Sequence, residues 1–480
     1  MNCLLGLDFG TTSVSAVSIS PDGELLGVHS RKHDAFLPHE DPLARIQSLD
    51  RLAAVAKECL KSVLAEANAE PLALGLTGQM HGFICLDAAG QAVSDLITWL
   101  DFRSLSLKSA GNEAWSAELK RKLTEEVRER LGCDLHPGYA LLNVYALHKS
   151  GLLPGETAAI IDITGYFRSV LSSEPTVIDP TFAASWGIYN VRDGRVDEEV
   201  IAISGLDPTL FPACSDDRSV AQHVTAEAAK TWSLPEGLPV YLGIGDNQAA
   251  AHAAIENPET DLLINIGTGG QICWPTREFL PSKSIEVRPF LDGYLLNVGA
   301  GVSGGRDWQT YVRSVHGWLR DLGFEMEEHE LLERLKDAAT ECAKPGRRDG
   351  FPIFEPVFSG TRSDRQRRGH LSNLTDLNFN LREMSYAAVV GVLNCVCEPF
   401  DEVPHSRGNR KRIVLTGNFF EHFPWLSSRV AHRYRCTVVM PVHPEQAAVG
   451  AAMLAGSGLN RQSSIPRRYK TLSDRIWDTP

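Results

Sequence analysis

Apolar and polar positions follow two different rhythms along the chain, and these rhythms predict helices and short strands in alternation. Apolar residues recur with helical spacing over residues 49–67, 112–131, 326–343 and 384–396. Short runs rich in β-branched residues lie between them, at 72–76, 240–243, 413–415 and 437–440. Small residues dominate 444–455, which predicts a helix that packs closely against its neighbours. This alternation predicts a repeated α/β plan.

The first 20 residues predict a tight hairpin. Residues 4–9 are mostly apolar and residues 13–19 alternate in polarity, as two paired strands do. The join consists of small and hydroxyl residues, namely Gly10, Thr11, Thr12 and Ser13. Such a turn offers backbone amides and hydroxyls to phosphate oxygens. Asp8 lies beside it, where a carboxylate tolerates phosphate only across a cation, so the pattern suggests a nucleotide with Mg²⁺. A polar turn without a ligand is the alternative interpretation.

The opening pattern occurs a second time near the middle of the chain. Residues 261–274 align with the first hairpin when Gly267 and Thr268 are placed on Gly10 and Thr11, and Gly269 follows. Only the first copy has the acidic residue, because Asp8 falls opposite Asn265. Two such hairpins indicate two domains built on one plan, each offering a phosphate-binding turn to a shared cleft.

Length and composition narrow the class of protein. A chain of 480 residues exceeds what one hydrophobic core normally holds, so we expect two domains, 1–245 and 246–480. The formal net charge of −13 argues against nucleic acid as a partner. The ten cysteines lack paired metal-ligand spacing and are expected to be reduced core thiols. No run is long and apolar enough for a membrane helix, and no signal-like segment opens the chain, so we expect a cytoplasmic protein without a membrane partner.

Two stretches in the first half carry residues suited to a sugar. In residues 76–83, Gln79 and His81 can hydrogen-bond hydroxyls while Met80 packs against a carbon skeleton, although His81 capping a turn is the alternative. In residues 97–103, Trp99 offers an apolar face beside Asp101 and Arg103. For this second stretch a surface ion pair next to a buried Trp is the alternative.

Asp246 is the candidate general base. It follows a short strand and precedes an Ala-rich helix, just before the second hairpin. An Asp in this place is ordinarily a helix N-cap, and the two roles are compatible. We expect the helix N-terminus to lower its pKa and keep it ionised.

A further strand, residues 413–416, ends in Gly417 and Asn418. A turn of this kind can admit the flat face of a base or ribose beside the backbone. A strand-to-loop turn without a ligand is the alternative.

Taken in order, these segments resemble the FGGY family of carbohydrate kinases, which has the actin/hexokinase-like fold. The matching motifs are DFGTTS, GQMHG, TWLDFR, GDNQAA, NIGTGG, SGGRDW, TGN and EQAAVGAA, which together span about residues 3–455. The resemblance implies an α/β fold of two actin/hexokinase-like (ribonuclease H-like) domains with an interdomain cleft.

The resemblance also implies roles for individual residues. Asp246 is expected to be the catalytic base, and Asp8 and Asp246 are expected at the Mg²⁺ site. The residues expected to bind the sugar are Gln79, Met80, His81, Trp99, Asp101, Arg103 and Asn247. Those expected to bind ATP are Gly10, Thr11, Thr12, Ser13, Gly267, Thr268, Gly269, Gly304, Gly417 and Asn418.

Within the family, the stretch FAASWGIYN, residues 182–190, is most similar to members that act on a seven-carbon ketose. The expected reaction is ATP-dependent phosphorylation of the terminal hydroxyl of sedoheptulose, with xylulose, ribulose or another polyol as alternatives. A non-catalytic sugar or nucleotide sensor is the alternative of another class, and a homodimer is one expectation for the assembly. The chain departs from the family at Asn143, Ala146, Thr361 and Asn418.

Overall fold

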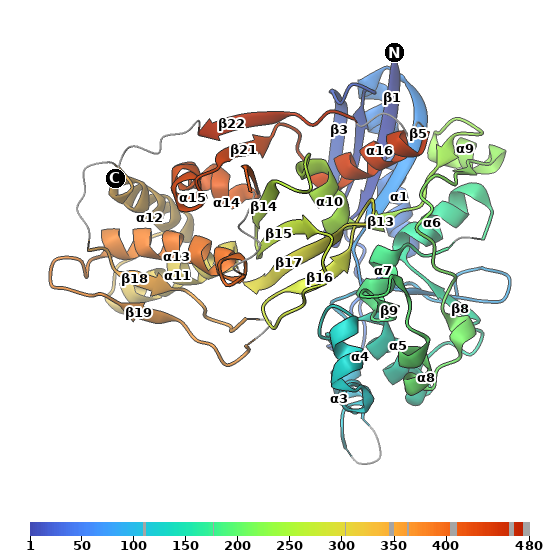
Figure 1. Cartoon of the computed structure of the whole chain (residues 1–480), viewed down its shortest axis with the longest axis horizontal. Coiled ribbons are helices and arrows are strands. Elements are labelled where there is room, and N and C mark those ends of the chain that lie inside the picture. The colour runs from blue at the N-terminus through green and yellow to red at the C-terminus, as the bar shows by residue number, and fades with distance from the viewer. Residues whose placement is uncertain are drawn as a thin grey trace.

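The chain folds into two mixed α/β units, which lie side by side along the long axis of the molecule (Figure 1). The computed structural model describes all residues except 109–111, 176, 303, 345–349, 362–363, 404–409, 460–464 and 474–480. Ser303, the first residue of the SGGRDW motif, therefore lies outside the described residues. The observed architecture confirms the predicted α/β class with a sheet in each unit.

The first unit is built on a mixed sheet with the strand order β11-β12-β5-β1-β2-β3, and β13 also pairs with β5. Its strands are β1 (Asn2–Phe9), β2 (Ser13–Ile19), β3 (Leu25–Lys32), β5 (Glu70–Gly78), β11 (Gln222–His223), β12 (Pro239–Val240) and β13 (Ile244–Gly245). Strands β1 and β2 pair antiparallel up to Phe9 and Val14, so the predicted first hairpin is confirmed. Strand β5 runs parallel to β1, which brings the end of β5 beside the hairpin turn.

The second unit repeats this arrangement in a sheet of order β16-β17-β15-β14-β20-β21-β22. Its strands are β14 (Asp261–Ile266), β15 (Gly270–Thr276), β16 (Glu286–Pro289), β17 (Leu295–Val302), β20 (Arg412–Thr416), β21 (Thr437–Pro441) and β22 (Tyr469–Ser473). Strands β14 and β15 form an antiparallel hairpin, and β20 runs parallel to β14 as β5 does to β1. The internal repeat predicted from the sequence is therefore present in the topology.

Short strand pairs brace the loops of both units. They are β4 (Ile46–Gln47) with β7 (Leu96–Ile97), β6 (Ile84–Leu86) with β8 (Ala159–Ile161), β9 (Tyr189–Asn190) with β10 (Arg195–Val196), and β18 (Ile353–Glu355) with β19 (His370–Ser372). The β4–β7 pair holds the segment that leads into Trp99.

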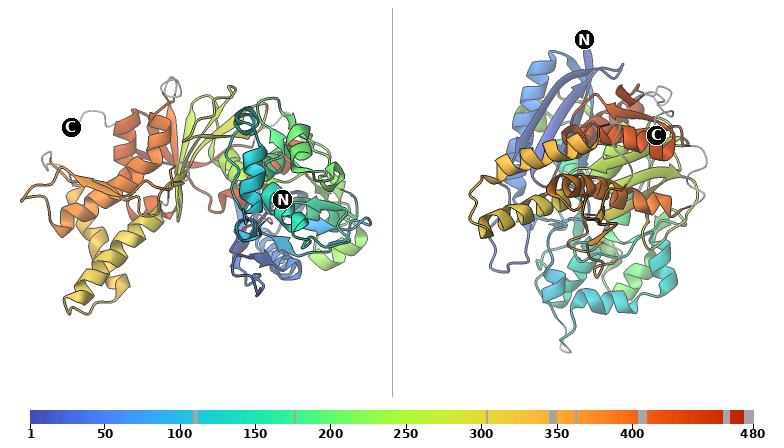
Figure 2. Two further views of the ribbon diagram at one scale, coloured as in Figure 1. Left: turned by 90° about the horizontal axis from the view of Figure 1, so that it is seen from below. Right: turned by 90° about the vertical axis from the view of Figure 1, so that its left-hand side faces the viewer.

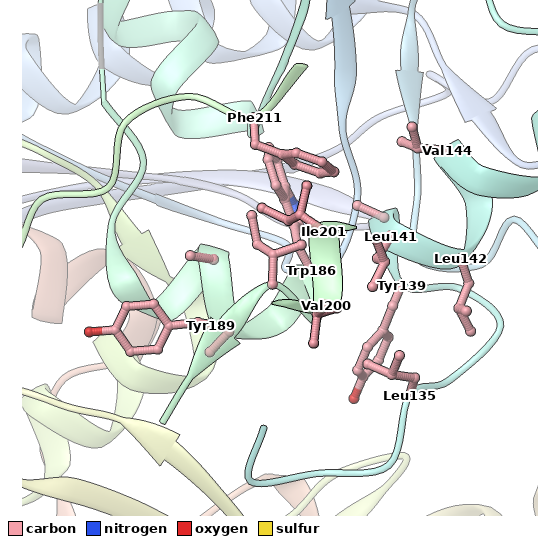
Figure 3. Close-up of a cluster of buried hydrophobic side chains, with 14 of the residues drawn as sticks. Leu135, Tyr139, Leu141, Leu142, Val144, Trp186, Tyr189, Val200, Ile201 and Phe211 are labelled. Carbon is pink, nitrogen blue, oxygen red and sulfur yellow. The ribbon is translucent and has the colours of Figure 1, made fainter. Parts of the chain in front are cut away.

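Helices of the first unit fall into two groups. Those that pack near the sheet include α1 (Leu49–Ala67), α6 (Ile163–Ser172) and α9 (Ala226–Trp232). The others are α2 (Arg103–Ser106), α3 (Trp115–Lys122), α4 (Glu125–Arg130), α5 (Ala140–Lys149), α7 (Pro180–Trp186), α8 (Glu198–Ser204) and the short 3-10 turn Pro208–Leu210. This second group shares a buried core that includes Tyr139 and Trp186 (Figure 3).

The helical segment predicted over residues 112–131 is two helices in the structure. Helix α3 ends at Lys122, and α4 begins after Thr124, whose Oγ1 accepts a hydrogen bond from the Val127 amide at 3.2 Å. A capping threonine inside an otherwise helical pattern therefore interrupts it. The other predicted helices are present with bounds shifted by a few residues, and so are the predicted strands 72–76, 413–415 and 437–440. The predicted strand 240–243 is wrong, because the chain there forms two separate two-residue strands, β12 and β13, with 241–243 between them outside any strand.

In the second unit, α11 (Gly305–Asp321), α12 (Glu328–Cys342) and α13 (Leu381–Asp401) pack together, and α14 (Asn418–His422) and α15 (Leu426–Tyr434) complete the helices beside the sheet. Figure 2 shows α11 to α13 at the end of the molecule remote from the first sheet.

Two helices made of small residues join the units. Helix α16 (Gln446–Leu459), late in the chain, packs on β1, β5 and α10 (Asp246–Ala254). A Cβ at Gly6 would lie 1.9 Å from the Ala448 carbonyl oxygen, and one at Gly450 would lie 1.9 Å from that of Ala249. Glycine is therefore required where these backbones meet. The division of the chain into 1–245 and 246–480 stays a prediction.

The structure gives the ten cysteines as free thiols, and nine of them are buried. Within the described part of the chain, no cluster of three or more His, Cys, Asp and Glu side chains is suited to a metal ion. No helix in that part is long and apolar enough to cross a membrane.

Candidate active site

A pocket of about 240 Å³ lies between the two units. The first hairpin, the loops after β5 and β7, the start of α10 and strands β15 to β17 contribute to its wall. The lining residues are Thr11, Met80, His81, Trp99, Asp246, Asn247, Gln248, Gln271, Glu286, Arg288, Val298 and Ala300. Four separate motifs from the sequence thus meet in one cavity.

Thr11 connects the first hairpin to the side chains expected to face the sugar. The Trp99 indole donates a hydrogen bond to Thr11 Oγ1 at 2.9 Å. Thr11 Oγ1 in turn donates to Gln79 Oε1 at 3.4 Å, and Gln47 Nε2 donates to the Thr11 carbonyl at 2.7 Å. Gln79 is buried, and its Nε2 donates to Gln47 Oε1 at 2.8 Å. Gln79 therefore supports the hairpin and is outside the set of lining residues.

The rest of the first turn is held through its backbone. His33 Nε2 lies 3.2 Å from the Gly10 carbonyl oxygen, and the His33 amide donates to the Thr12 carbonyl at 3.1 Å. Thr12 is exposed, whereas Gly10 and Ser13 are partly buried. The turn is thus fixed by its carbonyl groups and keeps an exposed hydroxyl.

His81 has a left-handed backbone conformation, with φ of 72°, which is unusual for a residue other than glycine. Ser185 of α7 stabilises it, because the His81 amide donates to Ser185 Oγ at 3.1 Å and Nδ1 lies 2.7 Å from the Ser185 carbonyl oxygen. The ring also stacks on Tyr139 with 4.1 Å between centroids. Trp186 Nε1 donates to the Gly82 carbonyl at 2.9 Å, so α7 fixes two consecutive residues of this loop.

Asp246 is the first residue of α10, and Gly245 occupies the N-cap position. The predicted N-cap role is therefore wrong, and so is the predicted fall in pKa. Burial raises the pKa of Asp246 to about 6, and the hydrogen bond at 2.7 Å from the Asn247 amide to Oδ1 only partly opposes this. The effect of desolvation on the pKa of Asp246 outweighs the effect of the helix N-terminus. The Asn247 side chain accepts a hydrogen bond from Gln271 Nε2 of β15 at 2.8 Å, which links the start of α10 to the second hairpin.

Asp8 has the chemistry of a cation ligand. Burial raises its pKa well above the usual range, and the negative charges of Asp246 and Glu445 raise it further. Its Oδ1 is buried, and no described residue forms a hydrogen bond with it. A divalent cation between Asp8 and Asp246 would offset both the repulsion and the unsatisfied oxygen, so these residues fit the expected Mg²⁺.

Asp101 and Arg103 form a buried ion pair, 2.9 Å between Arg103 Nη2 and Asp101 Oδ2. Their relative exposures are 0% and 7%, and neither lines the pocket. Asp101 also accepts hydrogen bonds from the backbone amide of Arg45, and its own carbonyl accepts one from Asn143 Nδ2 at 2.9 Å. The pair thus fixes the loop after Trp99. A direct role in binding sugar stays a prediction for both residues.

The second hairpin lies against two other turns of the second unit. The Gly305 amide donates to the Gly267 carbonyl at 2.9 Å and the Arg306 amide donates to the Thr268 carbonyl at 3.1 Å. Gly304, with φ of 51°, approaches so closely that a Cβ there would lie 2.5 Å from the carbonyl carbon of Gly269.

Gly417, between β20 and α14, has φ of 93°, and a Cβ there would lie 2.3 Å from the Ile266 carbonyl oxygen. The exposed Asn418 begins α14. The structure thus brings together the second-unit residues predicted to bind nucleotide, through close approaches of their backbones.

Some residues of the pocket were missed from the sequence. Gln248 follows the GDN triplet, while Gln271, Glu286 and Arg288 lie on strands β15 and β16, and Tyr139 stands behind His81 and Arg288. The strand residues occupy ordinary polar positions, Gln271 on the inner strand β15 and the other two on the edge strand β16. Only the sheet register and the contact between units bring them to the pocket.

Comparison with known proteins shows the family to which the chain belongs. Residues 3–253 match the N-terminal domain of the FGGY family of carbohydrate kinases. The chain is 25% identical to the gluconokinase of Bacillus licheniformis over 99% of this chain and 90% of that protein. It is 24% identical to the sedoheptulokinase of Mus musculus over 94% of this chain and 96% of that protein.

Among solved structures, the xylulose kinase from Rhodospirillum rubrum superposes with a TM-score of 0.82, at 22% identity, covering 99% of this chain and 94% of that one. This likeness establishes the fold. Carbohydrate kinases of the FGGY family are phosphotransferases that use ATP and act on sugar hydroxyls. Because the family match covers more than half of the chain, the protein belongs to the FGGY family of carbohydrate kinases.

Proposed function

We propose that the protein is a sedoheptulokinase, which transfers the γ-phosphoryl group of ATP to the terminal hydroxyl of sedoheptulose and gives sedoheptulose 7-phosphate. The observation that carries the proposal is Asp246, which lines a pocket between the two units with a pKa raised to about 6. A base with a pKa near the working pH both stays ionised and accepts a proton effectively.

In the proposed reaction the sugar occupies the pocket with its terminal hydroxyl at Asp246. The carboxylate accepts the hydroxyl proton while the oxygen attacks the γ-phosphorus and ADP departs. Met80 and Trp99 give the carbon skeleton apolar surface, and His81 and Asn247 offer polar groups for hydroxyls. The ordered loop that carries His81 fixes the sugar relative to the base.

ATP is proposed to lie between the two hairpins, with its phosphates at the turns Gly10–Ser13 and Gly267–Gly269. The adenine ring and the ribose of ATP are proposed to lie at Gly304, Gly417 and Asn418, where the glycine backbones pass close to neighbouring backbone. Asp8 and Asp246 would hold Mg²⁺, which neutralises phosphate charge when it is bound.

The choice of sedoheptulose rests on the FAASWG motif, residues 182–187. The similarity to a sedoheptulokinase over almost the full length of both chains supports it. A non-catalytic sensor would not need a general base, whereas Asp246 lines the pocket with a pKa of about 6. The cytoplasmic location and the homodimer stay predictions.

The test is ATP-dependent ADP release by the purified protein with sedoheptulose, D-xylulose, L- and D-ribulose, gluconate and glycerol. The highest kcat/KM is expected with sedoheptulose, and Asp246→Asn is expected to lower kcat by about 10² to 10⁴ while sugar binding is retained. Asp337→Asn, an exposed aspartate on α12, is the matched control. A higher kcat/KM with another sugar would overturn the substrate assignment, and near-native turnover of Asp246→Asn would overturn the role of the base.

A further inference from the structure

Strand β16 of the second unit supplies a charged pair to the sugar pocket. Glu286 and Arg288 both line the pocket, and Val287 between them points into the core of the first unit, as the alternation of a strand requires. The Val287 amide donates to the Gly132 carbonyl at 2.7 Å. The strand is therefore anchored in the first unit on one face and presents two charges to the pocket on the other.

Arg288 is held rigidly within this wall. Its Nη2 donates to Glu286 Oε2 and to the Tyr139 hydroxyl, both at 2.7 Å, and its Nη1 donates to the Ala184 carbonyl at 3.4 Å. Only 4% of the residue is exposed, and burial beside Glu286 leaves the guanidinium charged. These contacts use three of the five N–H groups of the guanidinium, so it can also donate to a ligand in the pocket.

The charges around the pocket decide which class of sugar it suits. Among the lining residues, all of them in the described part of the chain, Arg288 carries the only permanent positive charge. Glu286 compensates that charge, and Asp246 contributes a further negative charge once ionised. A sugar acid would bring its carboxylate to a wall without excess positive charge. A neutral sugar can accept hydrogen bonds from Arg288 and donate to Glu286.

We propose that Glu286 is a specificity-determining residue, which neutralises Arg288 so that the pocket selects a neutral polyhydroxy sugar and rejects an aldonate such as gluconate. The inference deepens the proposed function and rests on it for the place of the sugar. It assigns the discrimination between these substrate classes to one carboxylate on β16.

The test compares gluconate with sedoheptulose through the ratio of their kcat/KM values. Glu286→Gln preserves the shape and unmasks the charge of Arg288, so the ratio of gluconate to sedoheptulose is expected to rise at least about tenfold. Arg288→Gln removes the positive charge that faces Glu286, and the same ratio is expected to fall at least about tenfold. The double variant Glu286→Gln/Arg288→Gln restores a neutral wall and is expected to return the ratio to within about threefold of wild type.

Glu278→Gln, an exposed glutamate in the segment between β15 and β16, is the matched control and is expected to leave the ratio unchanged. Thermal unfolding of each variant checks that it folds. Since the two single variants move the ratio in opposite directions, either one tests the inference if the other does not fold. A ratio unchanged in the folded single variant would overturn the role of Glu286.

Calorimetric binding of gluconate and sedoheptulose without ATP separates this inference from the proposed reaction. A wild-type protein that binds sugar without turnover would overturn the proposed function, and the same variants would still shift the affinity ratio as described. Turnover of sedoheptulose with an unshifted affinity ratio in Glu286→Gln would overturn only the inference.

Discussion

Replacing Asp246 by asparagine is expected to make the protein more stable at neutral pH while it abolishes most of the activity. The side chain is largely desolvated, and its ionised form is disfavoured in the folded protein. An amide of the same shape removes the buried charge and also the repulsion that this charge exerts on Asp8. Both effects favour the folded state of the variant.

The magnitude follows from the pKa. Folding raises the pKa of Asp246 from 3.8 to about 6, and each unit corresponds to about 1.4 kcal/mol. The ionised carboxylate therefore lowers the free energy of unfolding by about 3 kcal/mol at neutral pH, an upper value because solvent screens a partly exposed side chain.

The sign of the pH dependence is fixed, because the folded protein binds this proton more tightly than the unfolded chain does. The stability that Asp246 contributes is fully present below pH 3.8 and is lost as the pH rises through about 6.

The assay is thermal unfolding of wild type, Asp246→Asn and the control Asp337→Asn between pH 4.5 and 8. The melting temperature of Asp246→Asn is expected to exceed that of wild type at pH 8, and the difference is expected to shrink steadily toward pH 4.5. The control is expected to follow wild type throughout. A variant less stable than wild type at pH 8, or a difference that does not change with pH, would refute the reasoning.

Three further outcomes are expected. The acid limb of kcat/KM should show an apparent pKa near 6, because protonation removes the base; a profile flat down to pH 5 would contradict this. Ser185→Ala should raise the sugar KM several-fold more than kcat falls, because His81 loses a hydrogen bond, whereas Ser169→Ala, a serine of α6 that does not line the pocket, should match wild type in steady-state kinetics. Gly304→Ala should raise the KM for ATP at least about tenfold, whereas Gly205→Ala, also at positive φ but with open space around it, should lower only the melting temperature.

The two hairpins could be predicted from the sequence because a hairpin is a local structure. Strand, turn and strand follow one another within 18 residues of the first copy, and the alternation of polarity marks both strands. The same holds for the loop of His81, which follows strand β5, and for the start of α10, which follows the short strand β13. The sequence also predicted that these segments meet, because two copies of the hairpin implied a cleft shared by two domains.

Other features could not be predicted because they depend on burial and on long-range contacts. The pKa of Asp246 rises since the surrounding units exclude water, and no local pattern reports that exclusion. Glu286 and Arg288 alternate with apolar residues as in any strand with one buried face. Only the packing of β16 against the first unit brings them to the pocket. The break at Thr124 was missed for a local reason, because this N-cap residue lies within a longer pattern of helical spacing.

Helix α7 contacts three parts of the pocket wall, although none of its own residues lines the pocket. Its Ser185 holds His81, the Thr181 hydroxyl accepts a hydrogen bond from the Gly245 amide at 3.0 Å beside Asp246, and the Ala184 carbonyl accepts one from Arg288. One short helix thus contacts His81, Gly245 and Arg288.

The helix is itself fully buried, so it can shift only as a unit with its surroundings. A change in its sequence would therefore move three sides of the pocket together.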